Sequence, residues 1–116
     1  MNAEDIKNSI SDHLKEAGES VDQSFNYGEF VNVPNNKGVF LIKERWFIYE
    51  IDEKNERSIT GPFQNEDIIY ACAMLMHISK YFDEYRFSPQ AKDIYIHTHF
   101  RSIKEAEENL EGGDRE

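Results

Sequence analysis

The sequence predicts an α+β fold, in which an antiparallel β-meander of three to five strands packs against a long central helix, with an N-terminal amphipathic helix and a short C-terminal helix. Two observations support this prediction. β-Branched and aromatic residues concentrate between residues 29 and 60, where Asn, Gly and Pro interrupt them. Apolar residues recur at helical spacing in segments 3–17 and 66–82. With 116 residues, 39% hydrophobic and 13% aromatic, the chain suffices for one domain, residues 1–116, whose core needs neither disulfides nor metal.

The first helix is expected over residues 3–17, because three apolar residues recur at every fourth position and form one narrow stripe. The stripe consists of Ile6, Ile10 and Leu14. Asn2 is suited to cap the helix start, and Gly18 to end the helix. A polar connector is expected over residues 18–28.

The meander is expected to follow, with short strands separated by turn residues. The expected strands are Glu29–Val33, Val39–Lys43, Trp46–Asp52 and Ser58–Thr60. The expected connections are Asn35–Gly38, Glu44–Arg45 and Glu53–Arg57, with Gly61–Pro62 ending the last strand. Alternation assigns Trp46, Ile48 and Glu50 to one face of the third strand, and Phe47, Tyr49 and Ile51 to the other. Since both faces carry aromatics, one face is expected to pack on a helix and the other to be partly covered.

The central helix is expected over residues 66–82, with Asn65 as its N-cap. Its broad apolar face comprises Ile68, Ala71, Cys72, Leu75, Ile78 and Phe82. Cys72 is the only cysteine, so the chain has no intramolecular disulfide, and the apolar neighbours of this residue predict a buried, inert thiol.

The remaining chain is expected to begin with a loop over residues 83–93. Asp93–Thr98 alternates and is compatible with one more strand. Ser102–Glu105 fits a capping box that opens a last short helix, and residues 112–116 are expected to form a frayed tail.

The net charge is −10, and it sits mainly at the two ends. Residues 1–24 and residues 102–116 each hold six acids and two bases, whereas the stretch between holds eleven acids and nine bases. This balance disfavours nucleic acid and anionic membranes as partners. It suits a basic protein partner, and equally plain solubility. The polar, acidic start, the lack of a long apolar run and the single cysteine predict a cytoplasmic protein.

Candidate catalytic chemistry is sparse. His97 and His99 would share one face of a strand, yet a metal site needs further ligands, and no spacing ties His13 or His77 to this pair. Surface or hydrogen-bonded histidines are therefore the preferred interpretation. The sequence contains no glycine-rich phosphate loop, nucleophile elbow or zinc-protease helix motif. We therefore expect no catalytic residues, no bound metal and no cofactor.

The segment from Gly38 to Phe82 resembles the small immunity proteins of bacterial polymorphic-toxin systems of the contact-dependent inhibition type. The resemblance lies in a strand with Trp46-Phe47-Ile48-Tyr49-Glu50, an acidic charged turn, a short strand and a helix opened by acids. Asn55 stands where the family often has a glycine in the turn. The resemblance implies a protein without enzymatic activity that neutralises a cognate toxin, often a nuclease, by binding it.

The expected partner-binding residues follow from this resemblance and from the charge. They are Glu50, Asp52, Glu53, Glu56, Glu66, Asp67 and Tyr49. Carboxylates on one face would occupy the basic groove of the toxin, with aromatic anchors setting specificity. Alternatives are a plain solvated acidic turn, an acidic DNA mimic or regulatory binding protein, a homo-oligomeric subunit with Met74 and Met76 partly exposed, and an enzyme that uses His97 and His99.

Overall fold

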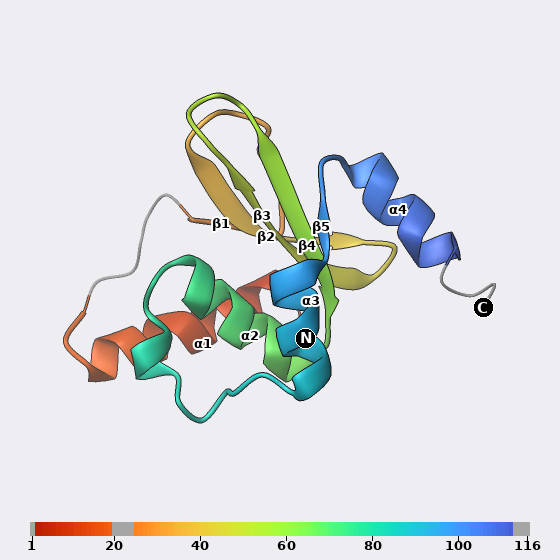
Figure 1. The fold of residues 1–116 in the computed structure, drawn as a ribbon. Helices are drawn as coiled ribbons and strands as arrows, with labels where there is room; N and C mark the ends of the chain where they lie inside the picture. The colour runs from red at the N-terminus through yellow and green to blue at the C-terminus, as the bar shows by residue number, and fades with distance from the viewer. Residues whose placement is uncertain (1, 20–24, 113–116) are drawn as a thin grey trace.

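The computed structural model describes residues 2–19 and 25–112, and it confirms the α+β class (Figure 1). The helical elements are α1 (Ala3–Glu16), α2 (Asn65–Leu75), the short 3₁₀-helix η1 (Ser79–Tyr81), α3 (Pro89–His97) and α4 (Ile103–Gly112). The strands are β1 (Phe25–Tyr27), β2 (Asn36–Ile42), β3 (Arg45–Ile51), β4 (Arg57–Phe63) and β5 (His99–Phe100). Residues 20–24 of the expected connector and 113–116 of the expected tail lie outside the described residues.

The five strands form one mixed sheet in the order β1-β2-β3-β4-β5. Strands β2, β3 and β4 follow one another in antiparallel pairs, and β5 pairs antiparallel with β4. The expected all-antiparallel meander fails at its edge, because Glu29–Val33 is not a strand. Instead β1 forms within the expected connector 18–28 and pairs parallel with β2. Gly38 permits this pairing, since a Cβ at that position would lie 2.4 Å from the carbonyl oxygen of Asn26.

Several strand boundaries differ from the expected ones. Strand β2 begins at Asn36 and not at Val39, so most of the expected turn Asn35–Gly38 belongs to the strand, where it pairs with β3. The β2–β3 hairpin turns at Lys43 and Glu44, one residue earlier than expected, and both residues have positive φ, 50° and 65°. Two positive φ values are what a tight hairpin turn requires. Strand β4 continues through Gly61 and Pro62 to Phe63, and a register shift between Trp46 and Ile48 of β3 accommodates the extra length.

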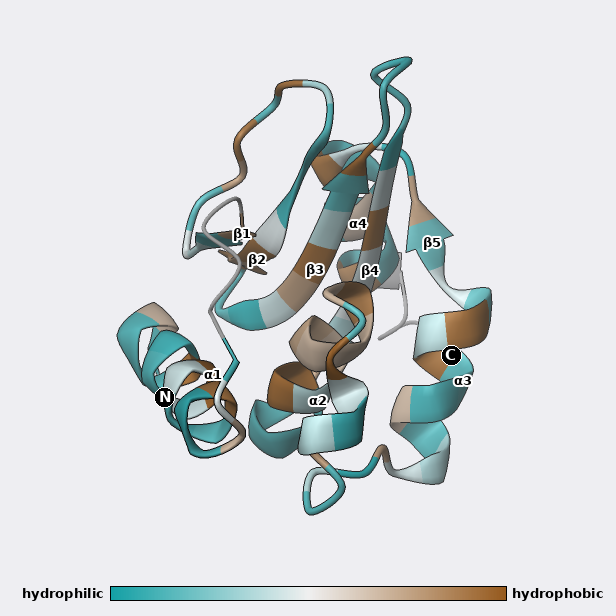
Figure 2. Cartoon of the chain, turned by 90° about the vertical axis from the view of Figure 1, so that its left-hand side faces the viewer, coloured by the Kyte–Doolittle hydropathy of each residue, from teal (hydrophilic) through white to brown (hydrophobic). Residues whose placement is uncertain are grey.

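The two faces of β3 are assigned as expected, and each face has its own core (Figure 2). Trp46 and Ile48 pack with residues of α1, α2 and α3. Phe47, Tyr49 and Ile51 pack on the opposite face, which α4 and Phe30 cover. In Figure 2 the helices α1, α2 and α3 lie in front of the sheet and α4 lies behind it.

Helix α1 forms as expected. Asn2 caps it through a reciprocal pair of hydrogen bonds with Asp5, each 2.9 Å long. Its stripe residues Ile6, Ile10 and Leu14 are buried. Through this stripe, α1 packs into the core on the face of the sheet that the helices cover.

The expected long central helix is shorter in the structure. Helix α2 ends at Leu75, and His77 takes a positive φ of 61°, which breaks the helix. Gln64, not Asn65, is the N-cap, and its side chain makes no capping hydrogen bond. Ile78 and Phe82 still join the core, because Ile78 stays hydrogen-bonded to Ala73 of α2 and Phe82 stacks on His13 of α1.

The expected extra strand at Asp93–Thr98 is wrong, because these residues belong largely to helix α3. The expected loop over residues 83–93 is also too long, since α3 begins at Pro89. Ser88 caps this helix by accepting the Ala91 N–H at 3.1 Å, and Pro89 occupies its first turn. The last helix opens close to the expected capping box. The Ser102 hydroxyl accepts the Glu105 N–H at 3.1 Å, while the Glu105 carboxylate accepts the N–H of Arg101.

Candidate functional site

Four exposed carboxylates gather at the β3–β4 turn, which we call the acidic turn. They belong to Glu50, Asp52, Glu53 and Glu56. Asp52 Oδ1 accepts the backbone N–H groups of Lys54 and Glu56, both at 2.9 Å. Asn55 takes a φ of 64°, the left-handed conformation that asparagine tolerates well. The turn therefore has a defined backbone conformation, which one carboxylate oxygen of Asp52 stabilises.

Glu50 differs from the other three acids because it lies within the sheet. It stands across from Lys37 of β2 and Ser58 of β4, on the face that carries the helices. Lys37 Nζ donates to the Leu75 carbonyl at the end of α2, 3.3 Å away. Burial and the nearby charge of Glu50 raise the pKa of Tyr95 on α3. Glu50 thus connects the acidic turn with the helical face.

Two hollows flank the acidic turn. One, of about 630 Å³, lies toward the start of β2, and the other, of about 350 Å³, lies toward β5. Glu50, Asp52 and Glu56 line both hollows. Residues 50–57 hold four carboxylates against the two cations Lys54 and Arg57, so this segment carries a net charge of −2. The surface is negative, although its charge is mixed.

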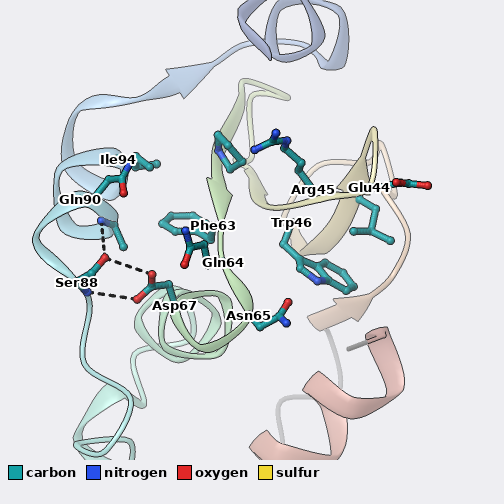
Figure 3. Close-up of a pocket in the computed structure, with 13 residues that line it drawn as sticks. Glu44, Arg45, Trp46, Phe63, Gln64, Asn65, Asp67, Ser88, Gln90 and Ile94 are labelled. Atoms are coloured by element: carbon teal, nitrogen blue, oxygen red, sulfur yellow. Dashed lines mark hydrogen bonds between the residues drawn. The ribbon is translucent and has the colours of Figure 1, made fainter. Parts of the chain in front are cut away.

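Glu66 and Asp67 lie elsewhere. They follow β4, whereas the acidic turn precedes it, so the seven-residue strand separates the two groups. Asp67 lines a different hollow, of about 430 Å³, with Trp46 and Phe63 (Figure 3). Its carboxylate accepts both the backbone N–H and the hydroxyl of Ser88, each at 3.3 Å. The structure therefore does not bring the six expected acids onto one face.

Tyr49 is buried, with 1% of its surface exposed, and it points to the face opposite Glu50. Its hydroxyl accepts the Val31 N–H at 3.1 Å, and its ring packs against Phe30 and Phe40. In this conformation Tyr49 is unavailable to a partner, and it supports the loop that precedes β2.

That loop carries an exposed apolar residue that no sequence motif signals. Val33 is 48% exposed, and Asn35, two residues further along the loop, donates its backbone N–H to the Asp52 carbonyl at 3.3 Å. Lys37, His99 and Arg101 also line the two hollows. Sheet pairing places them there, and no sequence motif signals it.

The two histidines of the His97-x-His99 pattern have separate environments. His99 Nε2–H donates to the Ile96 carbonyl at 3.2 Å, and its Nδ1 accepts from the Thr60 hydroxyl at 2.8 Å. His97 ends α3 and faces Asp93 at 3.9 Å. Within residues 2–19 and 25–112, no three His, Cys, Asp or Glu side chains form a group able to hold a metal ion. The structure thus does not pair His97 with His99 as ligands.

Two other expected features have clear positions. Cys72 is fully buried, and burial raises the pKa of its thiol far above the ordinary value, so the thiolate is disfavoured. Met76 is 8% exposed, so the expected partial exposure is not found there, while Met74 is half-buried.

None of the helices in the described part of the chain combines the length and the apolar character needed to cross a membrane. No protein-family model, curated protein or solved structure matches the chain.

Proposed function

We propose that this protein is an immunity-type inhibitor, which binds a basic toxin domain through the acidic turn and thereby blocks it. The observation that supports the proposal most directly is the grouping of four exposed acids between two hollows, with Glu50 at the end of β3 and Asp52, Glu53 and Glu56 in the turn that follows. A nuclease or another phosphate-binding enzyme presents a basic surface, and carboxylates held in such an arrangement are complementary to it.

The turn is suited to binding because its shape exists before a partner arrives. Asp52 fixes the backbone through two side-chain hydrogen bonds, and Asn35 connects the turn to the loop that carries Val33. Ordering a flexible segment at an interface opposes association, so a preformed turn loses less free energy on binding.

The apolar contact of this surface is assigned to Val33 and no longer to Tyr49. Val33 is about half exposed, on a loop that Asn35 joins to the acidic turn and that Tyr49 supports from within. Interfaces commonly combine an apolar centre with a polar rim. In the proposed interface Val33 contributes the apolar contact, and Glu53 and Glu56 contribute the rim.

Affinity capture from the native host followed by a growth assay tests this function. The bait variants are wild type, Glu53→Lys/Glu56→Lys, and the matched control Glu4→Lys/Glu108→Lys, which changes the net charge equally at exposed sites on α1 and α4. Wild type and control should retain one basic protein that the turn variant loses. Expression of that protein's captured domain should stop growth, and co-expression of wild type should restore it. Retention of the partner by the turn variant, or a partner that is harmless to the cell, would contradict the proposal.

A further inference from the structure

His13 of α1 is enclosed by the connector between α2 and α3, residues 76–88, which lies beside α1 (Figure 1). Its ring stacks on Phe82 with 4.6 Å between centroids and an interplanar angle of 20°. The edge of Tyr85 approaches it at 5.2 Å. Only 19% of the His13 side chain is exposed. The orientation of the ring is therefore set by packing.

Both ring nitrogens of His13 face oxygen atoms that can only accept hydrogen bonds. Nδ1 lies 2.8 Å from the carbonyl oxygen of Ser9, one helical turn earlier. Nε2 contacts the carboxylate of Glu84 in the connector. An imidazole donates from both nitrogens only when it is protonated, so this geometry fits the imidazolium. A neutral ring would turn a lone pair toward one of the two oxygens.

The charges around the ring favour the same state. Burial lowers the pKa of His13, but the hydrogen bonds to Glu84 and Ser9 and the charges of Glu84 and Glu16 raise it further, and the net pKa lies above the ordinary 6.5. The other titratable groups nearby are Tyr85, whose hydroxyl lies 3.4 Å from Ser9 Oγ, and the exposed carboxylates of Asp12 and Asp83, next to His13 and Glu84 in sequence.

We propose that His13 is a proton-controlled latch, in which the imidazolium holds residues 83–86 of the connector against α1 and loss of the proton releases them. The release is local, because both ends of this segment have independent attachments. Phe82 is fully buried at one end. At the other end, Phe87 packs against Phe63 and Tyr70, and Ser88 is bonded to Asp67. Helix α1 itself stays in place through its buried stripe and a hydrogen bond of 2.9 Å from the Tyr81 hydroxyl to Glu19.

NMR on the full chain tests the latch. The wild type is compared with Glu84→Gln, which removes the partner carboxylate from an exposed position, and with Asp83→Asn, which removes an equal charge one residue away. Two quantities are measured: the apparent pKa of His13, and the carbon-detected relaxation of residues 83–86 at pH 6 and pH 8.5. Carbon detection is used because it does not depend on amide exchange.

The latch predicts that the wild-type segment is rigid at pH 6 and mobile on the nanosecond scale at pH 8.5. Asp83→Asn should behave in the same way. Glu84→Gln should lower the pKa of His13 and show the same mobility at both pH values. The proposal is overturned if wild-type mobility does not change with pH, if His13 titrates at or below 6.5, or if the two substitutions lower its pKa equally.

Discussion

Asp52 and Glu56 are joined across the acidic turn by two hydrogen bonds. The Asp52 side chain accepts the Glu56 N–H at 2.9 Å, and the Asp52 N–H donates to the Glu56 carbonyl at 3.1 Å. One of the acids proposed to meet the partner thus also shapes the turn that presents the others. Its substitution is expected to act on stability as well as on binding.

Asp52→Ala should lower the free energy of unfolding by about 1 kcal/mol, because two backbone N–H groups lose their acceptor where water can partly replace it. Asp52→Asn should retain most of the stability, since the amide oxygen can accept the same bonds. Chemical denaturation of the two variants and of the wild type measures the difference. Equal stability of all three proteins would show that the side chain does not support the turn.

Tyr49→Phe should destabilise the protein by about 1–2 kcal/mol, because the Val31 N–H loses its acceptor in a partly buried place. The acids of the turn are untouched, so affinity for a partner should change little at a temperature where the variant is folded. Thermal unfolding together with a binding titration separates the two effects. A large loss of affinity without a loss of stability would indicate that Tyr49 contacts the partner directly.

Val33→Ser should weaken partner binding by roughly 1 kcal/mol, the order expected for apolar surface of this size removed from an interface. The matched control is Leu41→Ser, because Leu41 is equally exposed, at 48%, but lies near the opposite end of β2. Calorimetric titration of both variants measures the effect. Equal loss from the two substitutions would indicate a general effect of surface hydrophobicity and not a contact made by Val33.

The contribution of His13 to stability should depend on pH with a defined sign. Its folded-state pKa is raised, so the stabilisation is fully present below the ordinary value of 6.5 and is lost as the pH rises through the higher folded value. The melting temperature of the wild type should therefore exceed that of Glu84→Gln at pH 6, and the difference should shrink by pH 9. A difference that grows with pH would contradict the sign.

Local signals in the sequence predicted α1 and the two faces of β3 correctly. The stripe at Ile6, Ile10 and Leu14 and the alternation from Trp46 to Ile51 depend only on spacing, and burial followed that spacing. Ser88 and Pro89 suit the start of α3, but the sequence analysis assigned them to a loop, and the alternating residues after them favoured a strand. Two competing local patterns decided that error.

Other features depend on contacts between distant segments. The parallel pairing of β1 requires the close approach of Asn26 to Gly38. No pattern in the sequence around either residue indicates this approach. The break after α2 at His77 interrupts a continuous helical pattern, and Ile78 and Phe82 pack into the core from outside the helix. The candidate site shows the same division. Its four turn acids are neighbours in sequence, whereas Lys37 and His99 join them only through the sheet.

The most direct test of the proposed function is the affinity of the acidic turn for the captured toxin domain. We would titrate that domain with wild type, Glu53→Lys/Glu56→Lys and Glu4→Lys/Glu108→Lys at low and at physiological salt. The account predicts that the turn variant binds at least roughly tenfold more weakly, mainly through slower association, and that the control binds like the wild type. Equal weakening by both double variants would show that the affinity depends on the net charge of the protein and not on the acidic turn. An unchanged affinity of the turn variant would contradict the assignment of the site.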